Sequence, residues 1–204
     1  MEGRGMASVD AASVKKLREM TNAGIMDCKG ALAEAGGDFD KAATILREKG
    51  IAAAGKKAER TAADGLIGIY VHTDNKQAAL VEINCETDFV AKTEEFQQLC
   101  RDIAMQVVAM RPQYVRREEV PAEVLEAEKS IYRQQAAGEG KPEAILDKIA
   151  EGRLNKFYGQ VCLMEQPFIK DDKKTIEQLV KEAIGKLGEN IRVARFTRYK
   201  VGEA

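Results

Sequence analysis

The chain has 204 residues, of which 45% are hydrophobic and 32% are charged, and its 32 basic and 33 acidic side chains leave a net charge of −1. This composition supports a packed core, and the balanced charge argues against direct nucleic-acid binding. No stretch reaches the ~18 uncharged apolar residues of a membrane span, and the first residues lack the hydrophobic stretch of a secretory signal. We therefore expect a cytoplasmic protein that does not contact a membrane.

Side chains suited to catalysis are few. The four cysteines lie far apart without a C-x-x-C pair, and His72 is the single histidine. This spacing argues against a zinc site and a disulfide scaffold, and the sequence has no phosphate-binding glycine loop. We therefore expect no metal, no cofactor and no bond chemistry. A small enzyme that uses His72 with a thiol or a carboxylate is a rival hypothesis.

Residues 1–50 are predicted to form a docking module of three short helices. Apolar residues recur at helical spacing in three stretches, with breaks at 21–24 and 36–38. Asp38 is a suitable N-cap for the third helix, and Gly50 is a suitable C-cap. A core of about forty residues is marginal alone, so the module is expected to work beside a larger body.

Residues 51–65 are small and basic and carry no large apolar side chain after Ile51. We interpret them as a linker, helical in part, that lets the first module move relative to the rest. Lys56, Lys57 and Arg60 are available to an acidic partner, although solvation of a linker is the simpler explanation of their charge.

Residues 66–72 and 78–85 are predicted to form the two strands of a hairpin with a turn at 73–77, and Ala79, Val81, Ile83 and Cys85 show the alternation of a half-buried strand. Helical spacing of apolar residues then continues to about Met110. Between the second strand and this helix lies a short connection, Thr87–Val90.

Two interpretations of the Thr87–Val90 turn are open. In the structural one, Thr87 or Asp88 caps backbone donors and Phe89 fills the core beneath the turn. In the functional one, a rigid scaffold presents an acid and an aromatic side chain to a partner. The chemistry of these residues alone favours the structural interpretation.

Residues 121–158 contain two narrow apolar seams flanked by charges and separated by a Gly/Pro turn. This pattern predicts a protruding antiparallel coiled-coil hairpin, either an arm for a partner or a pair of ordinary core helices. Asp172 is predicted to open a helix through Leu187, and residues 191–201 are predicted to be a strand.

Together these elements predict an α+β fold, in which a three-stranded antiparallel sheet is packed with helices. The α+β core, which we also expect to be the dimerisation domain, comprises residues 66–120 and 159–204.

Five runs of the sequence occur in a very specific order. They are VKKLREMTNAGIMDCK at 14–29, VEINCETDFVA at 81–91, GKP at 140–142 leading to AEGRL at 150–154, QPFI at 166–169 and RFTRY at 195–199. In these runs, and over essentially its whole length, the chain resembles the short form of bacterial translation elongation factor Ts. Longer members carry two related copies of the core hairpin and helix, whereas this sequence shows one.

The resemblance implies a guanine nucleotide exchange factor that binds elongation factor Tu carrying GDP and promotes GDP release, so that GTP can bind. The three-helix module would be similar to a ubiquitin-associated fold and would dock on the nucleotide-binding domain of the partner. By the same match, Arg18, Ile25 and Met26 are expected partner contacts.

The resemblance also implies a role for the Thr87–Val90 turn. Thr87, Asp88, Phe89 and Val90 are expected to form the exchange element, which pushes between partner helices and disturbs the site that holds Mg²⁺. This implication reverses the preference for a purely structural turn. A protein-binding adaptor without exchange activity is the alternative function.

Short forms are expected to pair, because two chains then supply the surface that one long chain gives. We expect a homodimer through the late strand and a complex with two copies of each protein. Some short forms carry a cysteine near the C-terminus that links the pair, but Thr197 stands there in this sequence, which argues against a covalent dimer.

Overall fold

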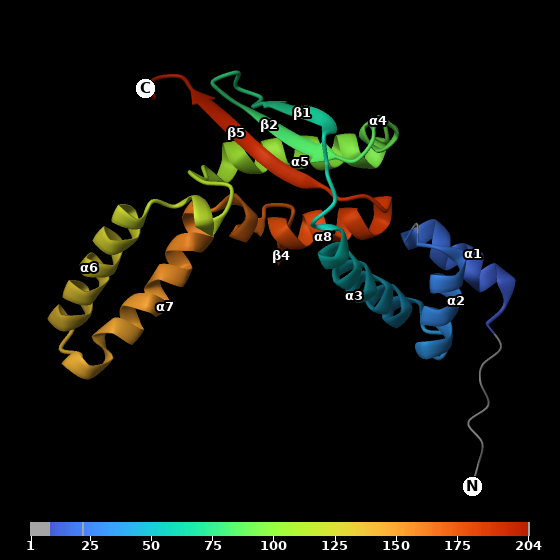
Figure 1. Cartoon of the computed structure of the whole chain (residues 1–204), viewed down its shortest axis with the longest axis horizontal. Coiled ribbons are helices and arrows are strands. Elements are labelled where there is room, and N and C mark those ends of the chain that lie inside the picture. Colours follow the sequence, from blue (N-terminus) through green and yellow to red (C-terminus); the bar gives the residue numbers. More distant parts are fainter. Residues whose placement is uncertain (1–8, 22, 204) are drawn as a thin grey trace, which may run out of the picture. The chain divides into compact units, whose positions relative to one another are not determined.

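A computed structural model describes residues 9–21 and 23–203, and this part of the chain holds eight α-helices and five β-strands (Figure 1). The mixture confirms the predicted α+β class. Residues 1–8, at the start of the expected docking module, and Asn22 within it lie outside the described part. The chain divides into two compact units: the first is the chain to Gly65 with Asn84–Phe96 and Val180–Arg192, and the second is Leu66–Ile83, Gln97–Leu179 and the residues from Val193 onward.

The three helices predicted near the N-terminus are present as α1 (Ala11–Thr21), α2 (Ile25–Glu34) and α3 (Phe39–Lys57). Asp38 caps α3 as predicted, because its carboxylate accepts hydrogen bonds of 3.0 Å from the backbone N–H groups two and three residues further on. These donors have no partner within the helix. The apolar faces form one small core of Val14, Leu17, Cys28, Ala31, Leu32, Ala42 and Leu46.

The prediction that Gly50 ends the third helix is wrong. The helix continues to Lys57, so residues 51–57 of the expected linker are helical. Gly50 serves a close helix crossing instead: a Cβ added at Gly185 of α8 (Ile176–Leu187) would lie only 2.8 Å from the Gly50 Cα. Glycine on both helices lets their backbones approach this closely.

The main sheet has the strand order β1–β2–β5 and is antiparallel, as predicted. Its strands are β1 (Asp64–Val71), β2 (Gln77–Cys85) and β5 (Arg192–Lys200). Helix α5 (Glu94–Met110) passes so close to β1 that a Cβ added at Gly68 would lie 2.5 Å from a carbonyl oxygen of this helix. Alternate residues of β2 are buried, namely Ala79, Val81, Ile83 and Cys85.

The segment before the last helix differs from the prediction. Residues 172–175 do not open the helix but belong to β4 (Asp171–Thr175), which pairs with β3 (Pro167–Phe168). Helix α8 follows at once, and Thr175 and Gln178 form a capping box. The Thr175 N–H donates to Gln178 Oε1 at 3.0 Å, and the Gln178 N–H donates to Thr175 Oγ1 at 3.2 Å. The polar β4 gave no alternating pattern from which a strand could be predicted.

Helices α6 (Ala122–Gly138) and α7 (Glu143–Val161) form the predicted antiparallel hairpin in the second unit (Figure 1). Ion pairs tie the hairpin together: Arg133 Nη1 of α6 lies 2.9 Å from an oxygen of Asp147 in α7, and Arg153 Nη2 of α7 lies 2.7 Å from an oxygen of Glu139, directly after α6. At the base of the hairpin, a small apolar cluster buries Val120, Val161 and Cys162.

The Gly50–Gly185 crossing can be tested by Gly185→Ala. The new methyl group would collide with the α3 backbone, which we expect to lower the free energy of unfolding by about 1–3 kcal/mol in urea titrations. Gly152→Ala in α7 is the matched control, since no atom lies within 4 Å of its Cβ position. That change should stabilise the protein by about 0.5–1 kcal/mol. Equal stabilisation by both changes would refute the close contact.

Candidate functional site

The Thr87–Val90 turn begins a single helical turn, α4 (Asp88–Ala91), directly after β2. Thr87 has extended backbone angles (φ −135°, ψ 156°), and its Oγ1 accepts a hydrogen bond of 3.4 Å from the Val90 N–H. Thr93 closes the other end, because its hydroxyl donates to the Val90 carbonyl at 2.7 Å. Thr87 therefore has the capping role that the structural interpretation gave it.

Phe89 does not have the role that the structural interpretation assigned to it. Its side chain is 79% exposed, so the expectation that it fills the core beneath the turn is wrong. Smaller side chains, Cys85 and Ala91, are buried at this place instead. The turn thus displays an aromatic ring that contributes little to its own packing.

Asp88 is exposed and pairs with Lys92 one helical turn further on, with 2.5 Å between its carboxylate oxygen and the Lys92 Nζ. This hydrogen bond is the main cause that lowers the pKa of Asp88, and it raises the pKa of Lys92. Both groups are therefore charged at neutral pH. Within this pair the two charges offset each other.

A residue that the sequence analysis missed holds this turn in place. The Glu189 carboxylate accepts hydrogen bonds of 3.0 Å from the N–H groups of both Glu86 and Thr87 and one of 2.6 Å from the Thr87 hydroxyl. All three residues belong to the first compact unit. The sequence places Gly188, Glu189 and Asn190 between a predicted helix and a predicted strand, which indicates a loop. It does not show which turn the Glu189 carboxylate contacts.

The expected docking residues lie on α1 and α2, in the same compact unit as the turn. Ile25 and Met26, at the start of α2, are 56% and 74% exposed, and Arg18 of α1 is also exposed. Arg18 and Ile25 line a hollow of about 400 Å³, while Met26 is not among its lining residues. The other lining residues are Val9, Ala11, Val14, Lys15 and Lys29. This surface offers apolar contact area ringed by positive charge.

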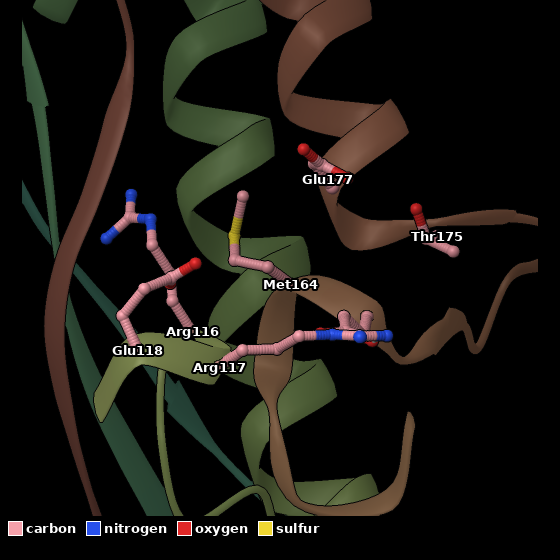
Figure 2. A pocket seen from close by; sticks show the side chains of 7 residues that line it. Arg116, Arg117, Glu118, Met164, Thr175 and Glu177 are labelled. Atoms are coloured by element: carbon pink, nitrogen blue, oxygen red, sulfur yellow. The ribbon is translucent and has the colours of Figure 1, made fainter. Parts of the chain in front are cut away.

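A second hollow, of about 490 Å³, lies in the second unit near the 3₁₀ turns η1 (Arg117–Glu119) and η2 (Leu163–Glu165). Figure 2 shows side chains of both charges around it. Arg117 forms an ion pair with Glu165, and its guanidinium lies 4.4 Å from the centre of the Tyr158 ring. The charge of this arginine is thus balanced within the wall of the hollow.

The surroundings of His72 do not support the rival hypothesis of a small enzyme. The Nδ1 atom of His72 lies 3.2 Å from the Tyr70 hydroxyl rather than beside a thiol. All four cysteines are buried, and none of them forms a disulfide. Burial is the largest cause that raises the pKa of the Cys85 and Cys162 thiols from 9.0 to about 11, which keeps them protonated and weakly nucleophilic at neutral pH. Within the described residues, no group of three or more His, Cys, Asp or Glu is placed to hold a metal ion.

Comparison with known proteins decides the family. The profile of the family described as Elongation factor TS matches residues 9–203. Elongation factor Ts of Desulforamulus reducens is 59% identical over 198 residues, which cover 97% of this chain and 91% of the relative. The chain belongs to the elongation factor Ts family. Two further factors Ts, from Heliobacterium modesticaldum and Geobacter sulfurreducens, are 57% identical over 195 residues and 56% identical over 196, each alignment covering 96% of this chain and 91% of the relative.

Family membership confirms the resemblance and the function class that it implies. The chain is a nucleotide exchange factor of translation elongation, and elongation factor Tu is its partner. Among the helices of the described residues, none is long and apolar enough to cross a membrane.

The buried thiols predict a pH dependence of stability. The pKa values of Cys85 and Cys162 are raised in the folded state, so the folded chain holds these protons more tightly than the unfolded chain between pH 9 and about pH 11. The free energy of unfolding should therefore fall as the pH rises through this range. Urea titrations should show a shallower fall for a Cys85→Ala/Cys162→Ala variant, and identical slopes would contradict the assignment.

Proposed function

We propose that this chain releases GDP from elongation factor Tu by pressing the Thr87–Val90 turn into the partner, close to the Mg²⁺ that holds the nucleotide. The exposed ring of Phe89 is the observation that carries the proposal. The turn is capped by Thr87 and held by Glu189, so this ring is not needed for local structure. Inserted into a partner pocket, it would contribute about 1.5–3 kcal/mol of apolar burial.

Displacement of partner elements suffices to release GDP without bond chemistry. Mg²⁺ bridges phosphate oxygens and protein ligands, so disturbing its site removes much of the charge compensation that holds the nucleotide. Coupling is reciprocal: a factor that binds the nucleotide-free partner better weakens nucleotide binding by the same factor. One carboxylate cannot replace an octahedral shell, and Asp88 is already paired with Lys92, so the proposed mechanism does not use Asp88 to capture the metal.

The docking helices, the helical hairpin and the core have further roles in the proposed exchange. We assign α1–α3 to a module like the ubiquitin-associated fold, which docks through Arg18, Ile25 and Met26 on the nucleotide-binding domain of the partner. The exposed apolar side chains and the adjacent basic rim support this assignment. Residues 121–158 serve as a protruding arm, and the strands and helices at 66–120 and 159–204 form the core.

We further propose that two copies pair through the sheet. The hydrogen bond of 2.8 Å from the His72 N–H to the Gln77 carbonyl sets the register of the β1–β2 hairpin and places Ile69 opposite Leu80. An antiparallel sheet with a large apolar patch on its open face is suited to stacking on a second sheet. The exposed apolar side chains of these strands are Ile67, Ile69, Val71, Leu80 and Tyr199. A pair would bind two copies of elongation factor Tu.

The exchange proposal is tested by stopped-flow release of labelled GDP from elongation factor Tu. Phe89→Ala should slow the stimulated release by about tenfold to a hundredfold, the equivalent of the lost apolar burial. Asp88→Ala should have a smaller effect, because its exposed ion pair contributes little. Val201→Ala after β5, another exposed apolar side chain, is the control and should retain the wild-type rate. Wild-type release by both turn variants would remove the role given to the turn, and no stimulation by the unmodified chain would favour an adaptor.

The pairing proposal is tested by light scattering. The wild type should have about twice the mass of one 22.4 kDa chain. Ile69→Asp should give monomers at the same concentration, because it places an unpaired carboxylate in the apolar sheet face. Ile145→Asp, at an exposed position of α7, should leave the mass unchanged. A wild-type mass of one chain at every concentration would exclude the pair.

A further inference from the structure

The Glu189 carboxylate makes more hydrogen bonds to the Thr87–Val90 turn than any local capping group does. One of its oxygens accepts from two consecutive N–H groups, those of Glu86 and Thr87, and the other accepts from the Thr87 hydroxyl. These donors lie at the end of β2, just before the first residue of α4. The contacts join residues that are more than a hundred positions apart in the sequence.

The bond to the hydroxyl also orients the capping group. A threonine hydroxyl has one proton to donate and lone pairs with which to accept. Because Thr87 donates that proton to Glu189, its lone pairs face the Val90 N–H, which lies 3.4 Å away. Glu189 therefore fixes both the backbone before α4 and the cap that starts it, which sets the direction in which Phe89 leaves the turn.

The chain around Glu189 is built to hold it in place. Gly188 has a left-handed backbone (φ +82°), which reverses the chain directly after α8. The Asn190 N–H donates to the Glu86 carboxylate at 2.6 Å, while the Glu86 N–H donates to the Glu189 carboxylate. Glu86 and the Gly188–Asn190 loop are therefore joined by two reciprocal hydrogen bonds. The Asn190 side chain donates in addition to the carbonyl of Arg60 at 2.7 Å, which ties the segment after α3 to the same point.

We propose that Glu189 is a positioning residue of nucleotide exchange: without touching the partner, it holds the Thr87–Val90 turn in the geometry that presents Phe89. The proposal rests on the exchange role proposed for that turn. It differs from a general stabilising role because it links Glu189 to the action of Phe89 and not to docking through α1 and α2.

The test measures GDP release from elongation factor Tu across a range of Tu·GDP concentrations. Glu189→Ala removes all three hydrogen bonds and should lower the maximal stimulated rate by at least on the order of tenfold, the scale of a single charge-assisted hydrogen bond. The half-saturating concentration should stay within about twofold, because the docking face is unchanged. Glu189→Gln keeps an acceptor oxygen for the two N–H groups and should recover most of the rate. Asp172→Ala, at an exposed position of β4, is the charge-matched control and should behave as wild type.

Double variants separate positioning from docking. Adding Glu189→Ala to Phe89→Ala should cause little further loss, because the two changes disable the same step. Adding it to Arg18→Ala should multiply the two losses. Thermal unfolding of each variant sets an assay temperature at which all are folded. Should Glu189→Ala not fold, Glu189→Asp replaces it: the shorter side chain withdraws the carboxylate from the turn and should be slower than Glu189→Gln.

The outcomes distinguish this proposal from the one on which it rests. If Phe89→Ala slows release but Glu189→Ala and Glu189→Asp match the wild type, Glu189 has no positioning role and the exchange role of the turn stands. If the losses of rate from Phe89→Ala and Glu189→Ala multiply fully in the double variant, the positioning role is also overturned. Glu189 would then act on a step that does not involve Phe89. If Phe89→Ala itself matches the wild type, the proposed exchange element fails first, and the positioning role fails with it.

Discussion

The turn that carries Phe89 depends on one carboxylate that accepts hydrogen bonds from a distant part of the sequence. The N–H groups of Glu86 and Thr87 lie between the end of β2 and the start of the helical turn, where an unpaired donor would be costly. Glu189 satisfies both of them, and it takes the Thr87 hydroxyl proton as well. Because polar contacts fix the turn, its largest apolar side chain is left free of a packing role.

The docking helices α1 and α2 also expose apolar side chains that their own fold does not need. The core of α1–α3 is small and closes without Ile25 or Met26, both of which remain exposed. Exposed apolar area of this kind adds nothing to folding, but it becomes available when a partner covers it. The exposed apolar side chains of α1 and α2 and the exposed ring of Phe89 belong to one compact unit. Within it, Asn190 bonds both to Arg60, after α3, and to Glu86, before the turn. A partner that engages both places therefore meets groups held by the same structure.

The sequence predicted those parts of the fold that depend on periodic burial. The alternation in β2, the stripes of α1–α3 and the paired seams of α6 and α7 each follow from one buried face, so a local pattern was sufficient. Gly50 was misread because a glycine that ends a helix and one that admits a second helix look alike until the partner glycine, Gly185, is known. The exposure of Phe89 could not be predicted from the turn sequence, because burial at this place falls on the smaller Cys85 and Ala91. Glu189 was missed for the same reason, since its contacts span more than a hundred residues.

The charges of the turn constrain how it can approach a metal site. Asp88 pairs with Lys92 within α4 and the residue that follows it, so an approaching partner meets a neutral pair beside an apolar ring. For Asp88 to repel phosphate or attract Mg²⁺, that pair would have to open, and the lysine would then offer an opposing charge within the same turn. Phe89 needs no such rearrangement, because its ring is already exposed and its burial is favourable wherever an apolar pocket opens. In the proposed mechanism the work of displacement therefore belongs to Phe89, while Lys92 offsets the charge of Asp88 and the pair supports the helical turn.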